Sequence, residues 1–304
     1  MIMVGDCLDV LAGIPDETIQ TCVTSPPYWG LRDYGVDGQL GLESDPELYI
    51  AKLVSIFREV RRVLKDDGTL WLNLGDSYSG GGNNSNNGKP LNSTQGRNRE
   101  SFRRDKASVI PEIKKVTGLR PKNLVGIPWR VALALQADGW ILRQDIIWHK
   151  PNPMPESVRD RCTKSHEYIF LLAKNPKYYF DHVSIKEPSV FNKQASAKKG
   201  SFGGKGAALK GNDSFRAVTE TRNKRSVWTI TTKAYKGAHF ATFPKDLITP
   251  CILAGSKVND IVLDPFSGAG TTGVVCKELN REYLGIEINP EYAQMAENRI
   301  AGVS

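Results

Sequence analysis

Two short motifs near opposite ends of the chain contain residue types that could do chemistry. Residues 24–29 read Thr-Ser-Pro-Pro-Tyr-Trp, and residues 264–272 read Asp-Pro-Phe-Ser-Gly-Ala-Gly-Thr-Thr. The first motif combines hydrogen-bond acceptors with a flat aromatic ring, which suits a pocket for an exocyclic amine. The second is a glycine-rich turn of the kind that holds a nucleotide-like cofactor.

The amine pocket is predicted from Ser25, Pro26 and Tyr28. An exocyclic amine on a nucleobase is a poor nucleophile because its lone pair is delocalised into the ring, and acceptors on both N–H groups localise that pair. The Ser25 hydroxyl oxygen and the Pro26 carbonyl can accept these bonds, and proline has no competing N–H. Tyr28 offers a face for a base swung out of a duplex. The motif predicts direct in-line transfer of a group to this amine, without a metal ion or a covalent intermediate on cysteine.

The glycine turn is predicted from Gly268-x-Gly270-x-x-Gly273, which follows an apolar run and precedes a helical pattern. Glycine lets the backbone turn sharply and approach a ligand closely. Glu287 ends the next predicted strand, where a carboxylate can accept both hydroxyls of a ribose. The same pattern is a dinucleotide fingerprint, so alone it also allows an NAD-dependent oxidoreductase or a turn that only packs a helix on a strand.

The elements that must position these motifs alternate between strand and helix, which predicts an α/β, doubly wound, mostly parallel sheet with an antiparallel edge. The expected strands are a short first strand before Asp6 and residues 21–24, 69–74, 140–148, 167–172, 177–180, 226–230, 260–263 and 282–286. The expected helices are 46–65, one that closes before Gly139, 243–253, 272–279 and 290–300.

Positive charge is concentrated in two irregular, glycine-rich regions. The formal net charge is +8, and residues 187–237 carry eleven basic and three acidic side chains, which equals the whole excess. Residues 79–106 add six basic and two acidic side chains, so the remainder is about −4. This pattern predicts a polyanion as partner, although solvated loops would give the same composition.

Composition excludes several other classes. No apolar run approaches the roughly 18 residues of a membrane span, and the N-terminal residues lack the pattern of a secretory signal. Five cysteines are scattered without a C-x-x-C pair, and four histidines are spread over the chain. We therefore expect no disulfide framework and no metal site, and a reducing cytosol as location.

Taken together, the two motifs resemble those of amino-directed DNA methyltransferases that use S-adenosylmethionine. Their order resembles the permuted subgroup called the beta class, and segments 5–11, 148–155 and 165–170 also resemble blocks of this family. The resemblance implies a circularly permuted Rossmann-like methyltransferase fold with an inserted DNA-recognition region. The implied division is 1–78 for the catalytic half of the core, 79–122 for a mobile basic loop, 123–186 for the core continuation, 187–237 for target recognition and 238–304 for the cofactor half.

The resemblance also implies roles for individual residues. Glu287 would bind the ribose hydroxyls, and Asp6 would contact the adenine, although it could equally be a helix cap. Phe243 would close the cofactor pocket, unless it only starts a helix. The methionine and ribose side would be lined by Asp264, Phe266, Gly268, Gly270 and Thr271. The side chains implied to reach guanine edges are Arg216, Arg222 and Arg225, and a non-specific electrostatic clamp is the alternative.

Serine at the first position of the amine motif is typical of cytosine-N4 enzymes within this family, which favours cytosine N4 over adenine N6 as the target. The implied partners are double-stranded DNA, a second copy of the chain and a companion restriction endonuclease, in the cytoplasm of a bacterial, archaeal or phage-infected cell. An inactive nucleic-acid-binding protein and an enzyme acting on RNA or protein are further alternatives.

Overall fold

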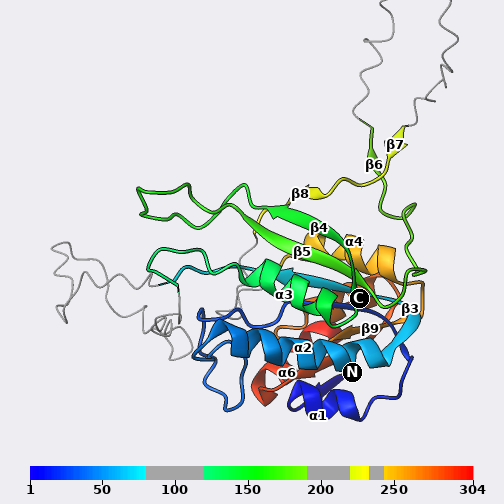
Figure 1. Ribbon diagram of the computed structural model, residues 1–304. Coiled ribbons are helices and arrows are strands. Elements are labelled where there is room, and N and C mark those ends of the chain that lie inside the picture. The colour runs from blue at the N-terminus through cyan, green and yellow to red at the C-terminus, as the bar shows by residue number, and fades with distance from the viewer. Residues whose placement is uncertain (80–118, 190–219, 233–242, 304) are drawn as a thin grey trace, which may run out of the picture.

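The computed structural model describes residues 1–79, 119–189, 220–232 and 243–303. The chain forms an eight-stranded sheet in the order β1-β10-β9-β2-β3-β5-β4-β8. Figure 1 labels several of its strands and the helices beside them. Its strands are β1 (Ile2–Val4), β2 (Ile19–Thr24), β3 (Leu64–Leu74), β4 (Ile141–His149), β5 (His166–Ala173), β8 (Val227–Thr229), β9 (Ile261–Asp264) and β10 (Glu282–Glu287). The helices are α1 (Cys7–Ala12), α2 (Pro46–Val63), α3 (Ile127–Ala137), α4 (Lys245–Gly255), α5 (Thr271–Glu278) and α6 (Pro290–Ala301).

The strand order shows that the two ends of the chain share one sheet. β1 pairs in parallel with β10, and β9 pairs in parallel with β2, so both C-terminal strands lie between β1 and β2. A sheet assembled in this way joins an N-terminal half to a C-terminal half that carries the glycine turn. The permuted, doubly wound arrangement predicted from the sequence is confirmed.

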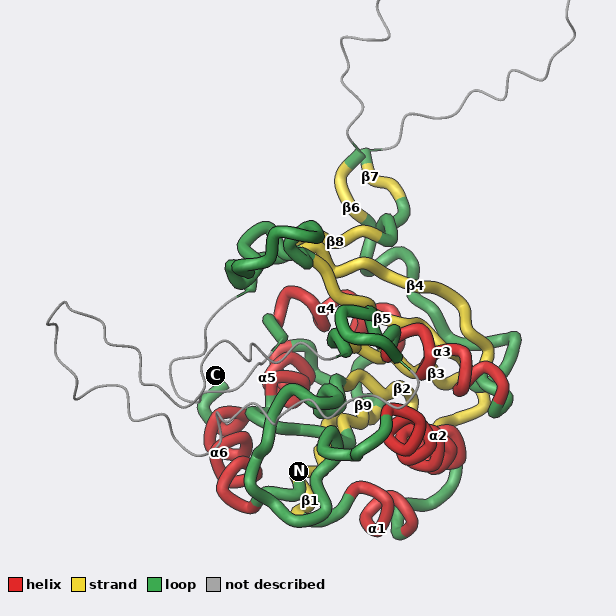
Figure 2. Tube along the Cα trace, turned by 60° about the vertical axis from the view of Figure 1, so that its left-hand side comes forward, coloured by secondary structure: helices red, strands yellow, loops and turns green. Residues whose placement is uncertain are grey.

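The chain leaves β2 and β9 in opposite directions. β2 leads through α2 to β3 on one side, whereas β9 leads through α5 to β10 on the other. Because such crossovers are right-handed, α2 and α5 cover opposite faces of the sheet, as Figure 2 shows. The carboxyl ends of β2 and β9 therefore meet at a topological switch point, the place where open α/β sheets bind ligands.

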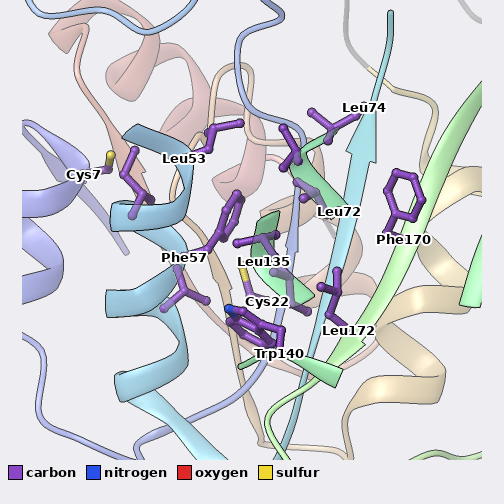
Figure 3. Packing of buried hydrophobic residues seen from close by; sticks show 14 of the residues in the cluster. Cys7, Cys22, Leu53, Phe57, Leu72, Leu74, Leu135, Trp140, Phe170 and Leu172 are labelled. Atoms are coloured by element: carbon purple, nitrogen blue, oxygen red, sulfur yellow. The ribbon is translucent and has the colours of Figure 1, made fainter. Parts of the chain in front are cut away.

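Two apolar layers hold the sheet between its helices. On one face α1, α2 and α3 pack over a core that includes Cys22, Phe57, Leu135 and Trp140 (Figure 3). On the other face α4 and α5 pack against a second cluster that includes Val23 from β2. Adjacent residues of β2 thus pack into opposite apolar layers, because successive side chains of a strand point to opposite faces of the sheet. Cys22 is part of the core, and burial raises the pKa of its thiol well above the ordinary value of 9.0.

The expected antiparallel part of the sheet is present. β5 runs antiparallel to both of its neighbours, β3 and β4, while β4 and the outermost strand β8 are parallel. The predicted strand at 177–180 is wrong, because these residues belong to no strand. The Tyr179 N–H donates to the Asp67 carbonyl over 2.8 Å, and the Phe180 ring stacks on Trp71 at 6.1 Å. The aromatic run is therefore held by individual hydrogen bonds and ring contacts, without pairing to a neighbouring strand.

A small antiparallel pair, β6 (Glu187–Pro188) and β7 (Thr221–Arg222), projects beyond β8 (Figure 1). Most of the two irregular basic regions, 80–118 and 190–219, lies outside the described residues. The division of the chain into catalytic, loop, recognition and cofactor segments stays a prediction.

Candidate active site

The switch point brings the two sequence motifs into direct contact. Thr24, the last residue of β2, donates its hydroxyl hydrogen to Asp264 Oδ1 over 2.7 Å, and both side chains are buried. Thr24 precedes Ser25, and Asp264 begins the glycine turn. A buried hydrogen bond between residues so far apart in sequence fixes the amine motif beside the predicted cofactor turn.

The Asp264 carboxylate organises the turn from within. Its Oδ2 accepts from the Thr272 hydroxyl at 2.7 Å, and its Oδ1 also accepts from the Phe266 N–H at 3.1 Å. Burial raises the pKa of Asp264, and the hydrogen bonds from Thr24, Thr272 and Phe266 act in the opposite direction. Because both oxygens accept from donors within the protein, Asp264 fixes the shape of the turn.

The two glycines at the centre of the turn have different surroundings. Both have a positive φ, 49° at Gly268 and 70° at Gly270. An added Cβ at Gly270 would lie 2.8 Å from the Cβ of Ala296, so this glycine allows α6 to approach. At Gly268 the nearest atom would be 3.9 Å away, which leaves space beside the turn. Next along the chain, the Thr271 hydroxyl accepts from Arg299 Nη1 at 3.0 Å.

Glu287 closes the turn from the end of β10. Its Oε2 accepts from the Gly268 N–H at 2.7 Å, and its Oε1 accepts from the Asn289 N–H at 3.0 Å. Burial raises the pKa of this carboxyl above its ordinary value of 4.5, and these two N–H groups oppose the shift. A largely buried carboxylate next to the open side of Gly268 fits the ribose hydroxyls of a nucleoside.

On the amine side, Ser25 joins a network of polar side chains that includes Asn73 from β3 and Glu167 from β5. Its Oγ lies 3.3 Å from Asn73 Oδ1 and 3.4 Å from Tyr28 Oη. Tyr28 Oη lies 3.0 Å from Asn73 Oδ1 and 2.9 Å from Glu167 Oε2. Glu167 also forms an ion pair with Lys150. The network holds Ser25 and Tyr28 beside one another, where the sequence predicts the amine pocket.

The Tyr28 ring is fixed at two places. Its hydroxyl belongs to the network, and burial, followed by the charge of Glu167, raises the pKa of this phenol well above 10.0, so that the proton is retained. Its ring lies against Gly75, where an added Cβ would come within 2.5 Å of Tyr28 Cε2. The ring position therefore depends on the absence of a side chain at Gly75.

The two prolines of the motif differ in their carbonyl groups. The Pro27 carbonyl accepts from Tyr49 Oη at 2.8 Å, which ties the motif to α2. Among the described residues, the Pro26 carbonyl has no hydrogen-bond donor. The role of this oxygen as an acceptor for a substrate amine stays a prediction.

The remaining predicted residues lie further from the switch point or serve other bonds. Asp6 caps α1, its Oδ1 accepting from the Leu8 N–H at 2.8 Å. Phe243 packs against the apolar cluster under α4. Arg222 and Arg225 each direct Nε to Glu187 Oε1, at 2.9 and 2.7 Å. Arg216 lies outside the described residues.

Three members of the amine network were missed in the sequence. A buried asparagine within the apolar run Trp71-Leu72-Asn73-Leu74 was the available signal, since a buried amide requires partners. Lys150 and Glu167 lie within segments 148–155 and 165–170, which resemble family blocks, but their residue types alone gave no sign of a role in this network. They join the site only through the pairing of β5 with β3 and β4.

The described ranges contain no cluster of three or more His, Cys, Asp or Glu side chains able to hold a metal ion. In the same part of the chain, no helix combines the length and the apolar character needed to cross a bilayer.

The permuted sheet, the glycine turn with its carboxylate and the adjoining amine motif define a class, the methyltransferases that use S-adenosylmethionine. The family model described as DNA methylase, of the N6/N4 methyltransferases, matches residues 19–298. This chain therefore belongs to the N6/N4 DNA methylase family. It is a DNA methyltransferase that uses S-adenosylmethionine, so the NAD-dependent alternative is set aside.

Two relatives are similar in sequence to this chain over nearly its whole length. The type II methyltransferase M.SmaI of Serratia marcescens is 51% identical over 305 residues, which cover 98% of this chain and 90% of the relative. The type II methyltransferase M.Cfr9I of Citrobacter freundii is 48% identical over 298 residues, 98% of this chain and 86% of the relative.

Solved structures share the fold. A putative DNA modification methylase from Thermus thermophilus, complexed with S-adenosyl-L-methionine, aligns with a TM-score of 0.60 at 25% identity over 99% of this chain and 92% of its own. The PvuII DNA methyltransferase, described as cytosine-N4-specific, aligns with a TM-score of 0.64 at 19% identity, covering 99% of this chain and 90% of its own. The second likeness concerns the fold alone.

Proposed function

We propose that this chain methylates the N4 amine of cytosine in double-stranded DNA, within a slot formed by Ser25, Pro26 and Tyr28. The observation that carries the proposal is the buried hydrogen bond from Thr24 to Asp264, because it holds the amine motif beside the glycine turn. An enzyme acting on a base edge must take the base out of the duplex, and the Tyr28 ring offers a surface on which that base stacks.

S-adenosylmethionine, when bound, supplies a methyl group activated by a sulfonium. In our proposal the Glu287 carboxylate accepts the ribose hydroxyls, and the space beside Gly268 admits the nucleoside. Asp264 holds the turn in shape. Asp6, Phe243, Phe266, Gly270 and Thr271 complete the cofactor-binding half as further proposed residues.

The slot residues act on the amine by accepting its hydrogens. Ser25 Oγ accepts from one N–H and the Pro26 carbonyl from the other, which localises the nitrogen lone pair for in-line attack on the methyl carbon. The N–C bond would form as the C–S bond breaks, with a neutral thioether as the leaving group. The amine proton then departs to water. Catalysis in this scheme comes from positioning and from acceptors that bind the rehybridised amine more strongly than the planar one.

The choice of cytosine rests on Ser25, as the residue typical of cytosine-N4 enzymes in this family. Adenine N6 is the second candidate, because a hydroxyl oxygen can accept from either amine. Arg222 and Arg225, on and after the projecting β6–β7 pair, are proposed to contact DNA together with Arg216. The type II designation of the relatives supports a companion restriction endonuclease as a further proposal, and pairing into a homodimer is a proposal of the sequence alone.

One experiment decides the target base. Polymerase-copied, unmodified DNA is incubated with the protein and methyl-labelled S-adenosylmethionine, digested to nucleosides and analysed by mass. We expect N4-methylcytosine. N6-methyladenine would replace the first candidate by the second, and the absence of any labelled nucleoside would contradict both.

A further inference from the structure

The hydrogen-bond network behind Ser25 has a direction that can be deduced from its members. Asn73 Nδ2 lies 3.0 Å from the Tyr168 carbonyl oxygen, which can only accept. The amide nitrogen must therefore face Tyr168, and Asn73 Oδ1 must face Ser25 and Tyr28. This removes the ambiguity that an isolated amide would have, and it makes Asn73 Oδ1 an acceptor within reach of either hydroxyl group.

Glu167 provides the second acceptor. An ionised carboxylate accepts only, and a hydrogen bond to a charged acceptor is stronger than one to a neutral amide. Tyr28 Oη is 2.9 Å from Glu167 Oε2, so its proton points toward Glu167. The Tyr28 oxygen then keeps a lone pair for Ser25, whose proton is accepted by Asn73 Oδ1 at 3.3 Å or by Tyr28 Oη at 3.4 Å.

Lys150 and Tyr28 contact different oxygens of the Glu167 carboxylate. The Lys150 ammonium pairs with Glu167 Oε1, which leaves Oε2 for the Tyr28 hydroxyl at 2.9 Å and for Asn73 Nδ2 at 3.4 Å. The same ammonium lies 4.1 Å from the centre of the Trp148 ring. The Lys150 and Glu167 side chains are only 18% and 17% exposed, so the pair is held in place more firmly than an ion pair on the surface.

We propose that Glu167 and Asn73 are positioning residues that draw the protons of Tyr28 and Ser25 inward. Both hydroxyl protons then have acceptors inside the protein, and the lone pairs of Ser25 Oγ face the slot. Ser25 thereby meets the substrate as an acceptor for the amine N–H and never as a donor. The inference rests on the proposed role of Ser25 in methyl transfer and adds the residues that set the direction of its hydroxyl.

The test is a double-mutant cycle on Glu167 and Tyr28. E167Q keeps the shape but presents an amide that can donate to Tyr28, and Y28F removes the hydroxyl through which Glu167 acts. We expect each single variant to lower kcat by roughly tenfold or more, the usual loss for a hydrogen bond to a charged group. We expect the dissociation constant for S-adenosylmethionine to stay unchanged. In the Y28F background, E167Q should cause almost no further loss of kcat, because the hydrogen bond between Tyr28 and Glu167 is already absent.

The matched control is E278Q, which removes a carboxylate from another glutamate–lysine pair, Glu278 with Lys245, at the far end of α5. Its kcat should equal that of the wild type. Should E167Q fail to bind S-adenosylmethionine, Y28F tests the same bond from the other end and leaves the pair of Glu167 with Lys150 intact. A wild-type kcat in Y28F would then overturn the inference.

Two further results would also overturn it. One is a wild-type kcat in E167Q, and the other is a loss from E167Q that is as large in Y28F as in the wild type, which would mark a merely structural role. Failure of the proposed function gives a different result, since the wild-type protein would then leave no labelled base in DNA.

Discussion

Thr24 Oγ1 and Asp264 Oδ1 lie 2.7 Å apart in the interior, at the junction between the N-terminal and C-terminal halves of the sheet. The strands that end at these residues are neighbours only because the C-terminal strands are inserted between β1 and β2. The bond thus connects the substrate motif to the cofactor motif directly, and its energetic weight can be measured.

Thr24→Val keeps the shape of the side chain and removes the donor. Asp264 then loses one of its compensating bonds in a buried position, which should lower the free energy of unfolding by about 1–3 kcal/mol. Denaturant titration measures this change. Thr18→Val is the control, because the Thr18 hydroxyl donates to the Pro15 carbonyl in an exposed hydrogen bond. Equal free energies of unfolding for the two variants would contradict the stabilisation expected from the hydrogen bond between Thr24 and Asp264.

Ser25→Ala tests the acceptor in the slot. We expect turnover to fall by roughly 100-fold or more, the loss seen when one polar group is removed from a stabilised transition state. The dissociation constant for S-adenosylmethionine should not change, because Ser25 belongs to the amine side. Single-turnover kinetics and equilibrium dialysis separate the two quantities. Ser55→Ala, which removes a hydroxyl on α2 that donates only to the Ala51 carbonyl, is the control. Equal losses in turnover and cofactor affinity would disprove the assignment.

Glu287→Ala should lower the affinity for S-adenosylmethionine more than it lowers turnover. The variant loses the proposed acceptor of the ribose hydroxyls and also the partner of the Gly268 N–H. Charged hydrogen bonds of this kind predict a dissociation constant for S-adenosylmethionine that is roughly 10- to 100-fold higher. Turnover at saturating cofactor should change less. A dissociation constant equal to that of the wild type would remove Glu287 from the site.

The raised pKa of Glu287 also predicts how cofactor affinity depends on pH. Hydroxyl donors favour the ionised carboxylate, so binding lowers the pKa of Glu287 and affinity is greatest where this group is charged. As the pH falls, affinity should decline, beginning at a higher pH than the ordinary glutamate value of 4.5 would give. Calorimetry between about pH 8 and about pH 5 measures the decline. Glu287→Gln has no such titration, and parallel curves for the two proteins would refute the prediction.

Much of the fold could be predicted because the strands and helices follow strong local patterns. Apolar runs alternating with helical patterns predicted the strands of both halves. The glycine turn and Glu287 were predicted to lie together, and the Gly268 N–H does donate to Glu287. The amine network could not be predicted, since it depends on the register that sets Asn73 opposite Ile169 and Leu74 opposite Tyr168. Local sequence contains no information on such pairing. The aromatic run at 177–180 shows the opposite error, because strand propensity there serves packing on Trp71.

Gly75→Ala tests whether the position of the Tyr28 ring matters as well as its hydroxyl. An added Cβ would lie 2.5 Å from Tyr28 Cε2, closer than real contacts allow, so the ring must move. Movement of the ring pulls the hydroxyl away from Asn73 and Glu167, and it displaces the surface proposed to stack on the base. We therefore expect kcat to fall at least as far as in Y28F, with unchanged affinity for S-adenosylmethionine.

The control for this substitution is Gly13→Ala, after α1. There the added Cβ would meet its nearest atom, the Val10 carbonyl oxygen, at an ordinary 3.5 Å. This variant should keep the wild-type kcat, and thermal unfolding of both variants reports any general loss of stability. A Gly75→Ala protein with wild-type turnover would show that the slot tolerates a displaced Tyr28, and the base would then have to be held by another surface.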